Sequence, residues 1–440
     1  MKIIQVLNHF LPQQTAGTEV YTWALSKALK ANNVEVKVII PNYEKSNDEE
    51  YAYDGLTVHK YAEPSNVDRS LIMGFREPDG LATFGAYLEK EKPDIVHFHE
   101  LAGSNGIGIS HLRAAKKTGA KVIMTFHLAS YTCATGTLMY KGKTPCGGKI
   151  NAIKCSACYL HKKGLGGTSN ILAAVSTILK RLHVDTSKLN HPMGTALGTA
   201  SIIRRKEEKL HELMELCDHV VCITKWYQQV LHINRVHMNK VSFIEQGLPT
   251  AFSENIERLN QKDTPIKLMF LGRISPFKGL HLLIEALVNF SATEIELSIF
   301  GNSDGTDYEV QLREKTKGKV NICWKGVLDQ DKVQEEMHQH DLLCLCSTFS
   351  EMSPLVIQEA RAAGLPVLAS NAPGNIEQLD HGTNGLIFAM NDLESLKKQL
   401  KNIIENPEIL IELKKNIQVP HSFSKVAREY DNLYQKLLTE

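Results

Sequence analysis

The chain has 440 residues, of which 43% are hydrophobic and 22% charged, and its formal net charge is +1. This length suits two domains better than one hydrophobic core, and the ordinary composition argues against long disordered stretches. The absence of a basic excess argues against a nucleic-acid partner. The opening MKIIQVLNHF is too short and polar for a signal peptide, and no run of about 18 apolar residues predicts a membrane span. We therefore expect a cytoplasmic protein with reduced cysteines.

Short apolar strands alternate with amphipathic helices along the chain, which is typical of parallel α/β architecture. In the first half the pattern predicts strands at 2–8, 35–40, 95–99, 122–125, 173–175 and 219–223, and helices at 18–32 and 81–91. After a polar seam near 247–265 it predicts strands at 267–272, 296–301, 321–324, 342–346, 367–369 and 385–388, with helices at 279–289 and 425–438.

This order predicts two doubly wound, Rossmann-like α/β domains that face a central cleft, because open parallel sheets bind ligands beyond the carboxyl ends of their strands. We place the first domain at 1–247, with a cysteine-containing insert near 133–165. The second domain spans 248–420. Residues 421–440 form a last helix that can cross back to the first domain.

Two glutamates eight positions apart, Glu351 and Glu359, follow the predicted strand at 342–346. Eight positions is a little over two helical turns, so both carboxylates can address one side of the segment. One carboxylate can accept the hydroxyls of a ribose and the other those of a donor sugar. On spacing alone, two solvated helix glutamates remain the simpler interpretation.

The ordered motifs together resemble glycosyltransferase family 4, whose E-x7-E motif matches Glu351 and Glu359. The resemblance implies the GT-B fold and a retaining, metal-independent transfer from a nucleotide-sugar. It places Glu359 on the ribose and Glu351 beside the donor sugar. Arg273 and Lys278, after the strand at 267–272, match the family's cations for the diphosphate. The backbone of Met352, Ser353, Pro354 and Leu355 is expected to donate N–H groups to the phosphates, with Gly301 and Val327 as further backbone neighbours of the donor.

In the first domain, Gly17 lies between the first strand and its helix, where backbone N–H groups can approach a phosphate. The family usually has two adjacent glycines here, and Ala16 replaces the first. His127 follows the strand at 122–125, and the resemblance implies that it lines the donor-sugar and acceptor site. Leu128 stands where the family usually has Asp, and a lone histidine can equally be structural.

Four cysteines in the insert, Cys133, Cys146, Cys155 and Cys158, have a spacing compatible with a tetrahedral structural zinc site. Free thiols or a reversible disulfide are the alternatives. The Asp329-Gln330-Asp331 sequence has the D-x-D form of metal-dependent transferases, but its position before a helix favours capping.

The stretch 179–213 is basic and partly amphipathic, so it is either a solvated face or a surface for anionic lipid or a pyrophosphate-linked acceptor. A peripheral contact at the inner face of the membrane follows from the second alternative.

The combined prediction is a retaining glycosyltransferase that moves a sugar from a UDP-, GDP- or ADP-sugar to a glycan, a lipid-linked group or another acceptor. Bacterial polysaccharide or glycoconjugate synthesis is the expected setting. Catalysis is expected to need no cofactor beyond the donor. The alternatives are a GT-B-type sugar-nucleotide epimerase or phosphorylase, and a catalytically degenerate scaffold. The base, sugar, acceptor and oligomeric state are not predicted.

Overall fold

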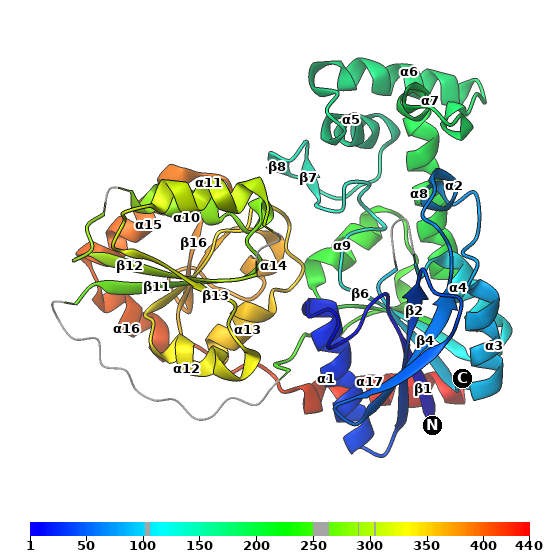
Figure 1. Cartoon of the computed structure of the whole chain (residues 1–440), viewed down its shortest axis with the longest axis horizontal. Coiled ribbons are helices and arrows are strands. Elements are labelled where there is room, and N and C mark those ends of the chain that lie inside the picture. Colours follow the sequence, from blue (N-terminus) through cyan, green and yellow to red (C-terminus); the bar gives the residue numbers. More distant parts are fainter. Residues whose placement is uncertain (102–105, 250–263, 289, 303–304) are drawn as a thin grey trace. The chain divides into compact units, whose positions relative to one another are not determined.

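A computed structural model describes residues 1–101, 106–249, 264–288, 290–302 and 305–440 (Figure 1). The chain folds into two compact units. Unit 1 comprises Met1–Pro249 together with Phe423–Glu440, and unit 2 comprises Thr250–Ser422. Each unit is an α/β domain with a largely parallel sheet, which confirms the predicted fold class. No helix in the described part of the chain is long and apolar enough to span a bilayer.

Unit 1 is built on an eight-stranded sheet with the order β10-β9-β6-β5-β1-β2-β4-β3. All neighbouring strands run parallel except β3 and β4, which form an antiparallel pair. The chain proceeds from β1 in both directions, so the switch in strand order lies between β1 and β5. The strands are β1 Lys2–Val6, β2 Glu35–Tyr43, β3 Glu49–Tyr53, β4 Leu56–Glu63, β5 Ile95–His99, β6 Lys121–Phe126, β9 His219–Cys222 and β10 Val241–Phe243.

The helices around this sheet include the C-terminal helix α17 (Phe423–Thr439), which packs on α1 (Gly17–Ala31). The hydroxyls of Tyr21 and Tyr430 lie 3.0 Å apart, and Nδ1 of His97 lies 2.8 Å from the hydroxyl of Tyr434. The buried stripe of α17 therefore completes the core of unit 1. The other helices around the sheet are α2 Arg69–Met73, α3 Leu81–Glu91, α4 Ile109–Lys117, α8 Thr199–Leu216 and α9 Lys225–Ile233.

Three helices form an arm at the start of α8, away from the sheet of unit 1 (Figure 1). They are α5 Ala152–Lys162, α6 Ser169–Arg181 and α7 Pro192–Leu197. A small core of Ala157, Leu160, Ala173 and Ala196 holds them together. The predicted strand at 173–175 is wrong, because this apolar run lies on the amphipathic helix α6. The cysteine insert is also more helical than expected, since α5 carries two of its cysteines; a short hairpin, β7 Met139–Tyr140 and β8 Thr144–Pro145, precedes it.

Unit 2 is built on a six-stranded parallel sheet with the order β13-β12-β11-β14-β15-β16. One apolar core lies under α10 and α15, and a second lies on the other face under α12 and α13. The strand order reverses between β11 and β14. The strands are β11 Ile266–Leu271, β12 Ile295–Phe300, β13 Ile322–Gly326, β14 Leu342–Leu345, β15 Val367–Ser370 and β16 Gly385–Phe388. The helices are α10 Leu280–Leu287, α11 Asp307–Thr316, α12 Val333–His338, α13 Leu355–Ala362, α14 Pro373–Ile376, α15 Leu393–Glu405 and α16 Glu408–Lys415.

Candidate active site

The predicted donor-binding residues of unit 2 follow strands that end at one edge of its sheet. Arg273 and Lys278 follow β11, and Glu351 follows β14, so these residues flank the point where the strand order reverses. Gly279 joins the two segments: its φ is 68°, and a Cβ there would overlap the carbonyl oxygen of Cys346. Only glycine permits this approach, which brings the segment after β11 against the segment after β14.

Lys278 and Glu351 form an ion pair at this edge. Nζ of Lys278 lies 2.6 Å from Oε1 of Glu351, and the Ser347 hydroxyl donates to the same oxygen at 2.6 Å. Glu351 is buried, whereas Arg273 is exposed and makes no ion pair with any described residue. The edge therefore offers one cation held by a carboxylate and one cation available to an anionic ligand.

Glu359, the second glutamate of the pair, is buried on α13 and accepts a hydrogen bond from Nε2 of Gln330 at 2.7 Å. Burial raises the pKa of the Glu359 carboxyl, and the Gln330 amide acts in the opposite direction. Gln330 was not singled out by the sequence for this role. It is the middle residue of Asp329-Gln330-Asp331, and the amide holds the carboxylate in a fixed orientation.

The segment between the two glutamates enters α13 with no side-chain cap. Met352, Ser353 and Pro354 precede the helix and Leu355 begins it, so backbone N–H groups of its first turn lack partners within the helix. A Cβ on Gly374 would overlap the carbonyl oxygens of Glu351 and Met352, and its N–H donates to the Glu351 carbonyl at 3.0 Å. The tight packing of Gly374 thus fixes a helix start suited to anions.

The two further backbone neighbours predicted for the donor, Gly301 and Val327, follow the neighbouring strands β12 and β13. Gly301 follows β12, and a Cβ there would overlap the Gly272 carbonyl oxygen, so the ends of β11 and β12 approach closely. Val327 follows β13 and is 68% exposed. Asp329 occupies the N-cap position of the short 3-10 helix Gln330–Lys332, as the capping interpretation expects. Its side chain makes no cap hydrogen bond there and pairs with Lys332 at 3.0 Å.

In unit 1, His127 follows β6 and is held by Glu100, which follows β5. One carboxylate oxygen of Glu100 accepts the backbone N–H groups of His127 at 3.0 Å and Leu128 at 2.8 Å. The other oxygen accepts the Ser130 hydroxyl at 2.5 Å. Glu100 adopts a φ of 70°, an unusual value for a residue with a side chain, and burial raises its pKa to about 7. Glu100 therefore positions the histidine segment.

The imidazole of His127 belongs to a buried chain of polar side chains. Its Nε2 lies 3.2 Å from Nδ1 of His99, and Nε2 of His99 lies 2.7 Å from Oε1 of Gln5. With the Gln5 oxygen as acceptor, His99 donates to it and His127 donates to His99, which leaves Nδ1 of His127 as an acceptor. Burial lowers the pKa of His127 to about 3, so the ring is neutral at physiological pH.

Gly17 begins α1, after β1 and at the same switch in strand order as His99. A Cβ at Gly17 would meet no other atom within 4 Å, so packing within the chain does not require glycine here. Ala16 is the N-cap and makes no side-chain cap hydrogen bond. Uncapped N–H groups at this end can meet an anion, although Glu19 lies in the same first turn.

The four cysteines of the insert line one cavity of about 20 Å³. Burial raises the pKa of Cys155 to about 11, and it also raises the pKa of Cys158. Without a bound metal these two thiols are therefore protonated at neutral pH, whereas zinc would bind them as thiolates. In the described residues, no group of three or more His, Cys, Asp or Glu side chains is arranged to hold a metal ion. The structural zinc site stays a prediction that metal analysis can test.

Two domain families match the sequence, one on each side of the seam. Residues 16–151 match the glycosyl transferase 4-like domain, and residues 251–419 match glycosyl transferases group 1. The chain is 24% identical over 236 residues to an uncharacterized glycosyltransferase of Methanocaldococcus jannaschii, which covers 50% of this chain and 60% of that protein. It is 31% identical over 201 residues to an uncharacterized glycosyltransferase of Haemophilus influenzae, covering 45% and 54%. The chain thus spans about half the length of the curated relatives it matches.

Solved structures match over the whole fold. Sucrose-phosphate synthase from Thermosynechococcus elongatus gives a TM-score of 0.67 at 15% identity, covering 100% of this chain and 99% of that one. The Anabaena protein HepE in complex with UDP and glucose gives 0.64 at 14% identity, covering 99% of each chain. The two α/β units together have the GT-B fold. With both domain matches, the chain belongs to the glycosyltransferases and is family 4-like.

Proposed function

We propose that the chain transfers a sugar from a nucleotide-sugar donor to an acceptor, with the donor bound at the edge of the unit 2 sheet. The observation that carries the proposal is the arrangement of Arg273, Lys278, Glu351 and Glu359 around the β11/β14 switch point. A carboxylate buried against Gln330 suits the two hydroxyls of a ribose. The Arg273 guanidinium, unpaired among the described residues, and the uncapped start of α13 suit the diphosphate.

The proposed reaction retains configuration at the sugar carbon. The acceptor hydroxyl forms a bond to the anomeric carbon on the face from which the nucleoside diphosphate leaves, and its proton passes to the departing phosphate. Arg273, Lys278 and the α13 N–H groups stabilise the charge that grows on the diphosphate. Nδ1 of His127 can accept a hydroxyl of the sugar or acceptor and so orient it.

The test is release of nucleoside diphosphate from UDP-, GDP- and ADP-sugars, followed with and without candidate glycan acceptors. Transfer predicts a glycosylated product and acceptor-stimulated release from one donor class, with the anomeric configuration kept in the product by NMR. An epimerase would interconvert the donor without any acceptor. No turnover with bound donor would favour a scaffold.

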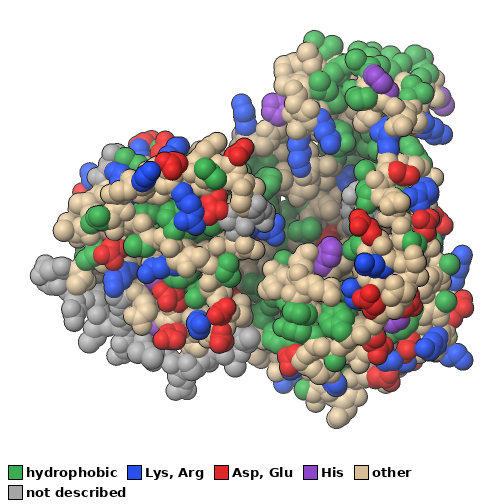
Figure 2. Space-filling model, viewed as in Figure 1, with side chains coloured by type: hydrophobic (Ala, Val, Ile, Leu, Met, Phe, Trp, Pro, Cys, Tyr) green, Lys and Arg blue, Asp and Glu red, His purple; other side chains and the backbone are tan. Residues whose placement is uncertain are grey.

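We further propose that the arm of unit 1, residues 152–197, contacts an anionic membrane surface. The arm holds six Lys or Arg residues and one acid, Asp185, which pairs with Arg205 at 2.7 Å. On α6, Ile171, Val175, Ile178 and the following Leu182 lie three or four positions apart and are all exposed, two of them by 67%. Figure 2 shows hydrophobic atoms exposed over this end of unit 1. Exposed apolar and basic side chains together fit an anionic lipid interface.

Co-sedimentation with vesicles tests the membrane proposal. The chain should sediment with phosphatidylcholine vesicles containing phosphatidylglycerol, less so at high salt, and the double variant Ile171→Glu/Ile178→Glu should lose most of this binding. Val320→Glu in unit 2, where Val320 is 83% exposed, is the matched control. Equal binding by both variants would contradict a role for the arm.

A further inference from the structure

A second cavity lies wholly within unit 1 and is strongly basic. It has a volume of about 330 Å³, is open to solvent, and is lined mainly by α8, α4, the segment 71–78 and the segment 130–134. Five cations line it and one acid, Glu77. This contrasts with the formal net charge of +1 for the whole chain. The cations are Arg76, Arg113, Arg205, Lys206 and Lys209.

The three arginines of the cavity are fixed by carboxylates. Arg76 pairs with Asp79 at 2.9 Å, Nε of Arg113 donates to Glu212 at 2.7 Å, and Arg205 pairs with Asp185 at 2.7 Å. An arginine has five N–H donors, so one carboxylate leaves donors over for a ligand. The pairs hold the guanidinium groups in place before a ligand arrives.

The two lysines differ from the arginines, because neither makes an ion pair or hydrogen bond with any described residue. Nζ of Lys206 lies 5.7 Å from the centre of the Tyr131 ring, and Lys209 lies against Gly74. Burial lowers the pKa of both ammonium groups; Arg205 and Arg113 lower the pKa of Lys209 further, whereas Glu212 raises it and Glu100 raises the pKa of Lys206. Because no described carboxylate pairs with either ammonium group, a bound anion would stabilise their positive charge.

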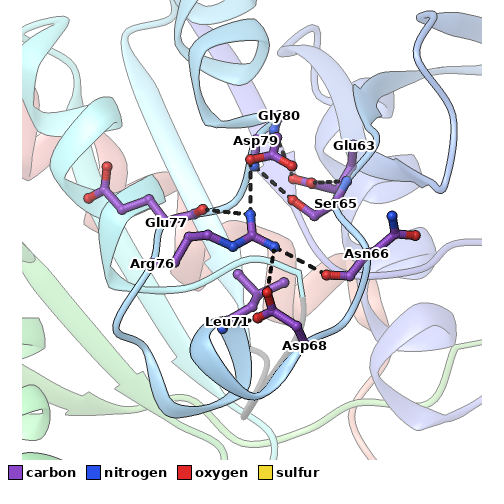
Figure 3. A network of polar contacts seen from close by, with 9 residues as sticks. All are labelled: Glu63, Ser65, Asn66, Asp68, Leu71, Arg76, Glu77, Asp79 and Gly80. Carbon is purple, nitrogen blue, oxygen red and sulfur yellow. Dashed lines mark hydrogen bonds and ion pairs between the residues drawn. The ribbon is translucent and has the colours of Figure 1, made fainter. Parts of the chain in front are cut away.

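A polar network, shown in Figure 3, surrounds Arg76, one of the cations that line the cavity. Besides Asp79, the guanidinium of Arg76 donates to the backbone carbonyl of Asn66 at 3.1 Å. The buried Glu63 accepts the N–H groups of Ser65 at 3.1 Å and Gly80 at 3.2 Å. These hydrogen bonds join residues within the segment 63–80, so the part of this segment that lines the cavity has a fixed conformation.

The cavity adjoins the histidine segment of the candidate active site. Ser130 lines the cavity and donates to Glu100, whose other oxygen holds the N–H of His127. A ligand group in the cavity would therefore lie beside the segment that presents His127 at the edge of the unit 1 sheet.

We propose that this basic cavity binds a phosphate or diphosphate group carried by the acceptor. The volume suits a small group, and two unpaired lysines beside fixed arginines suit a compact polyanion. The assignment to the acceptor rests on the proposed transfer, whereas anion binding by the cavity does not. The same chemistry can come from a free sugar phosphate or from a lipid-linked diphosphate.

The experiment uses the full chain and inorganic diphosphate in a calorimetric titration, in an Arg273→Ala/Lys278→Ala background that weakens binding at unit 2. We expect diphosphate to bind this background and the affinity to fall at least 10-fold on adding Lys206→Met/Lys209→Met. Arg204→Met, on the same helix but exposed and paired with Glu208, is the control and should bind as the background does. Lys206→Arg/Lys209→Arg should retain binding.

Equal affinity in the lysine-to-methionine variant and the Arg204 control would overturn the proposal. If the double variant does not fold, Lys209→Met alone gives the same comparison. Competition by a hexose phosphate would identify a soluble source, and competition only by vesicles containing a polyprenyl diphosphate would identify a lipid-linked one. Competition by neither would overturn the acceptor assignment. If the full chain binds no nucleotide-sugar but the cavity still binds diphosphate, the proposed sugar transfer is contradicted and anion binding by the cavity is not.

Discussion

The two charged sites of the molecule are built in opposite ways. In unit 2, Lys278 and Glu351 come from segments that Gly279 locks together, and they neutralise each other at 2.6 Å. In unit 1, the cations of the basic cavity come from α4, α8 and the segment 71–78, and Lys206 and Lys209 have no ion pair with a described residue. Before a ligand binds, the positive and negative charges of the first site therefore nearly cancel, whereas the second site carries a net positive charge.

This difference suggests a division of roles. At the unit 2 edge, Arg273, which has no ion pair with a described residue, can respond to charge that develops on a leaving diphosphate. Such differential stabilisation accelerates a reaction. A cavity whose two lysines have no ion pair with a described residue favours an anion in the ground state and so contributes to binding. Loss of Arg273 at the first site should lower kcat, and variants of the two lysines at the second should raise the KM for the acceptor.

The largest effect is expected at Arg273. Arg273→Ala removes the free cation of the unit 2 edge, and we expect turnover to fall about 10²- to 10³-fold, the usual size for loss of one transition-state donor. Glu359→Ala should instead weaken donor binding, because it removes the proposed ribose acceptor. Steady-state kinetics measure both, and Lys401→Ala, an exposed cation of unit 2, is the control. An unchanged turnover rate in Arg273→Ala would contradict the assignment of turnover to the unit 2 site and of acceptor binding to the basic cavity.

A stability effect of about 2–4 kcal/mol is expected at Gly279. Gly279→Ala forces a Cβ onto the Cys346 carbonyl and strains a φ of 68°. Gly318→Ala is the matched control: its φ is 76°, but a Cβ there meets nothing within 4 Å, so it should cost only about 1 kcal/mol. Denaturation followed by Trp324 fluorescence in a variant without the tryptophans of unit 1 measures both. Equal losses of unfolding free energy in Gly279→Ala and Gly318→Ala would show that the close approach of Gly279 to Cys346 does not stabilise the donor edge.

A smaller effect, about 2 kcal/mol per residue, is expected from buried histidines of unit 1 between pH 7 and 5. Burial lowers the pKa of His111 to about 3, as it does for His127, whereas an unfolded histidine titrates near 6.5. The unfolded chain binds more protons in this window, so the stability is present above pH 6.5 and is lost as the pH falls towards 3. His111→Gln should flatten the dependence of the unfolding free energy on pH, and the exposed His183→Gln should not. Parallel curves for the two variants would contradict this.

The sequence predicted the α/β fold because strand and helix periodicities alternate regularly in both halves. It missed the strands β3, β4 and β10 of the unit 1 sheet. The sequence EEYAY of β3 is mostly polar and exposed, and β10 has only three residues. It placed a strand at 173–175 because an apolar run of three residues does not distinguish a strand from part of a helix such as α6, where only Ala173 of the three is buried.

The candidate donor site was predictable because its residues lie in contiguous motifs at strand ends.

The basic cavity could be predicted only in part from the sequence. Arg205, Lys206 and Lys209 belong to the basic stretch at 179–213, but Arg76 and Arg113 are distant in sequence and join them only in the folded chain. The structure also divides that stretch, because Lys180 and Arg181 lie on the arm and Lys206 and Lys209 lie at the cavity.

The most direct test of the central claim is thermal stabilisation of the full chain by UDP-, GDP- and ADP-sugars, with and without EDTA. We predict that one nucleotide class raises the Tm, that EDTA leaves this rise unchanged, and that Glu359→Ala abolishes it. A fall in Tm with EDTA alone would support a metal in the cysteine insert. If no nucleotide-sugar shifts the Tm, or if Glu359→Ala responds as the wild type does, the donor site at the edge of the unit 2 sheet is contradicted.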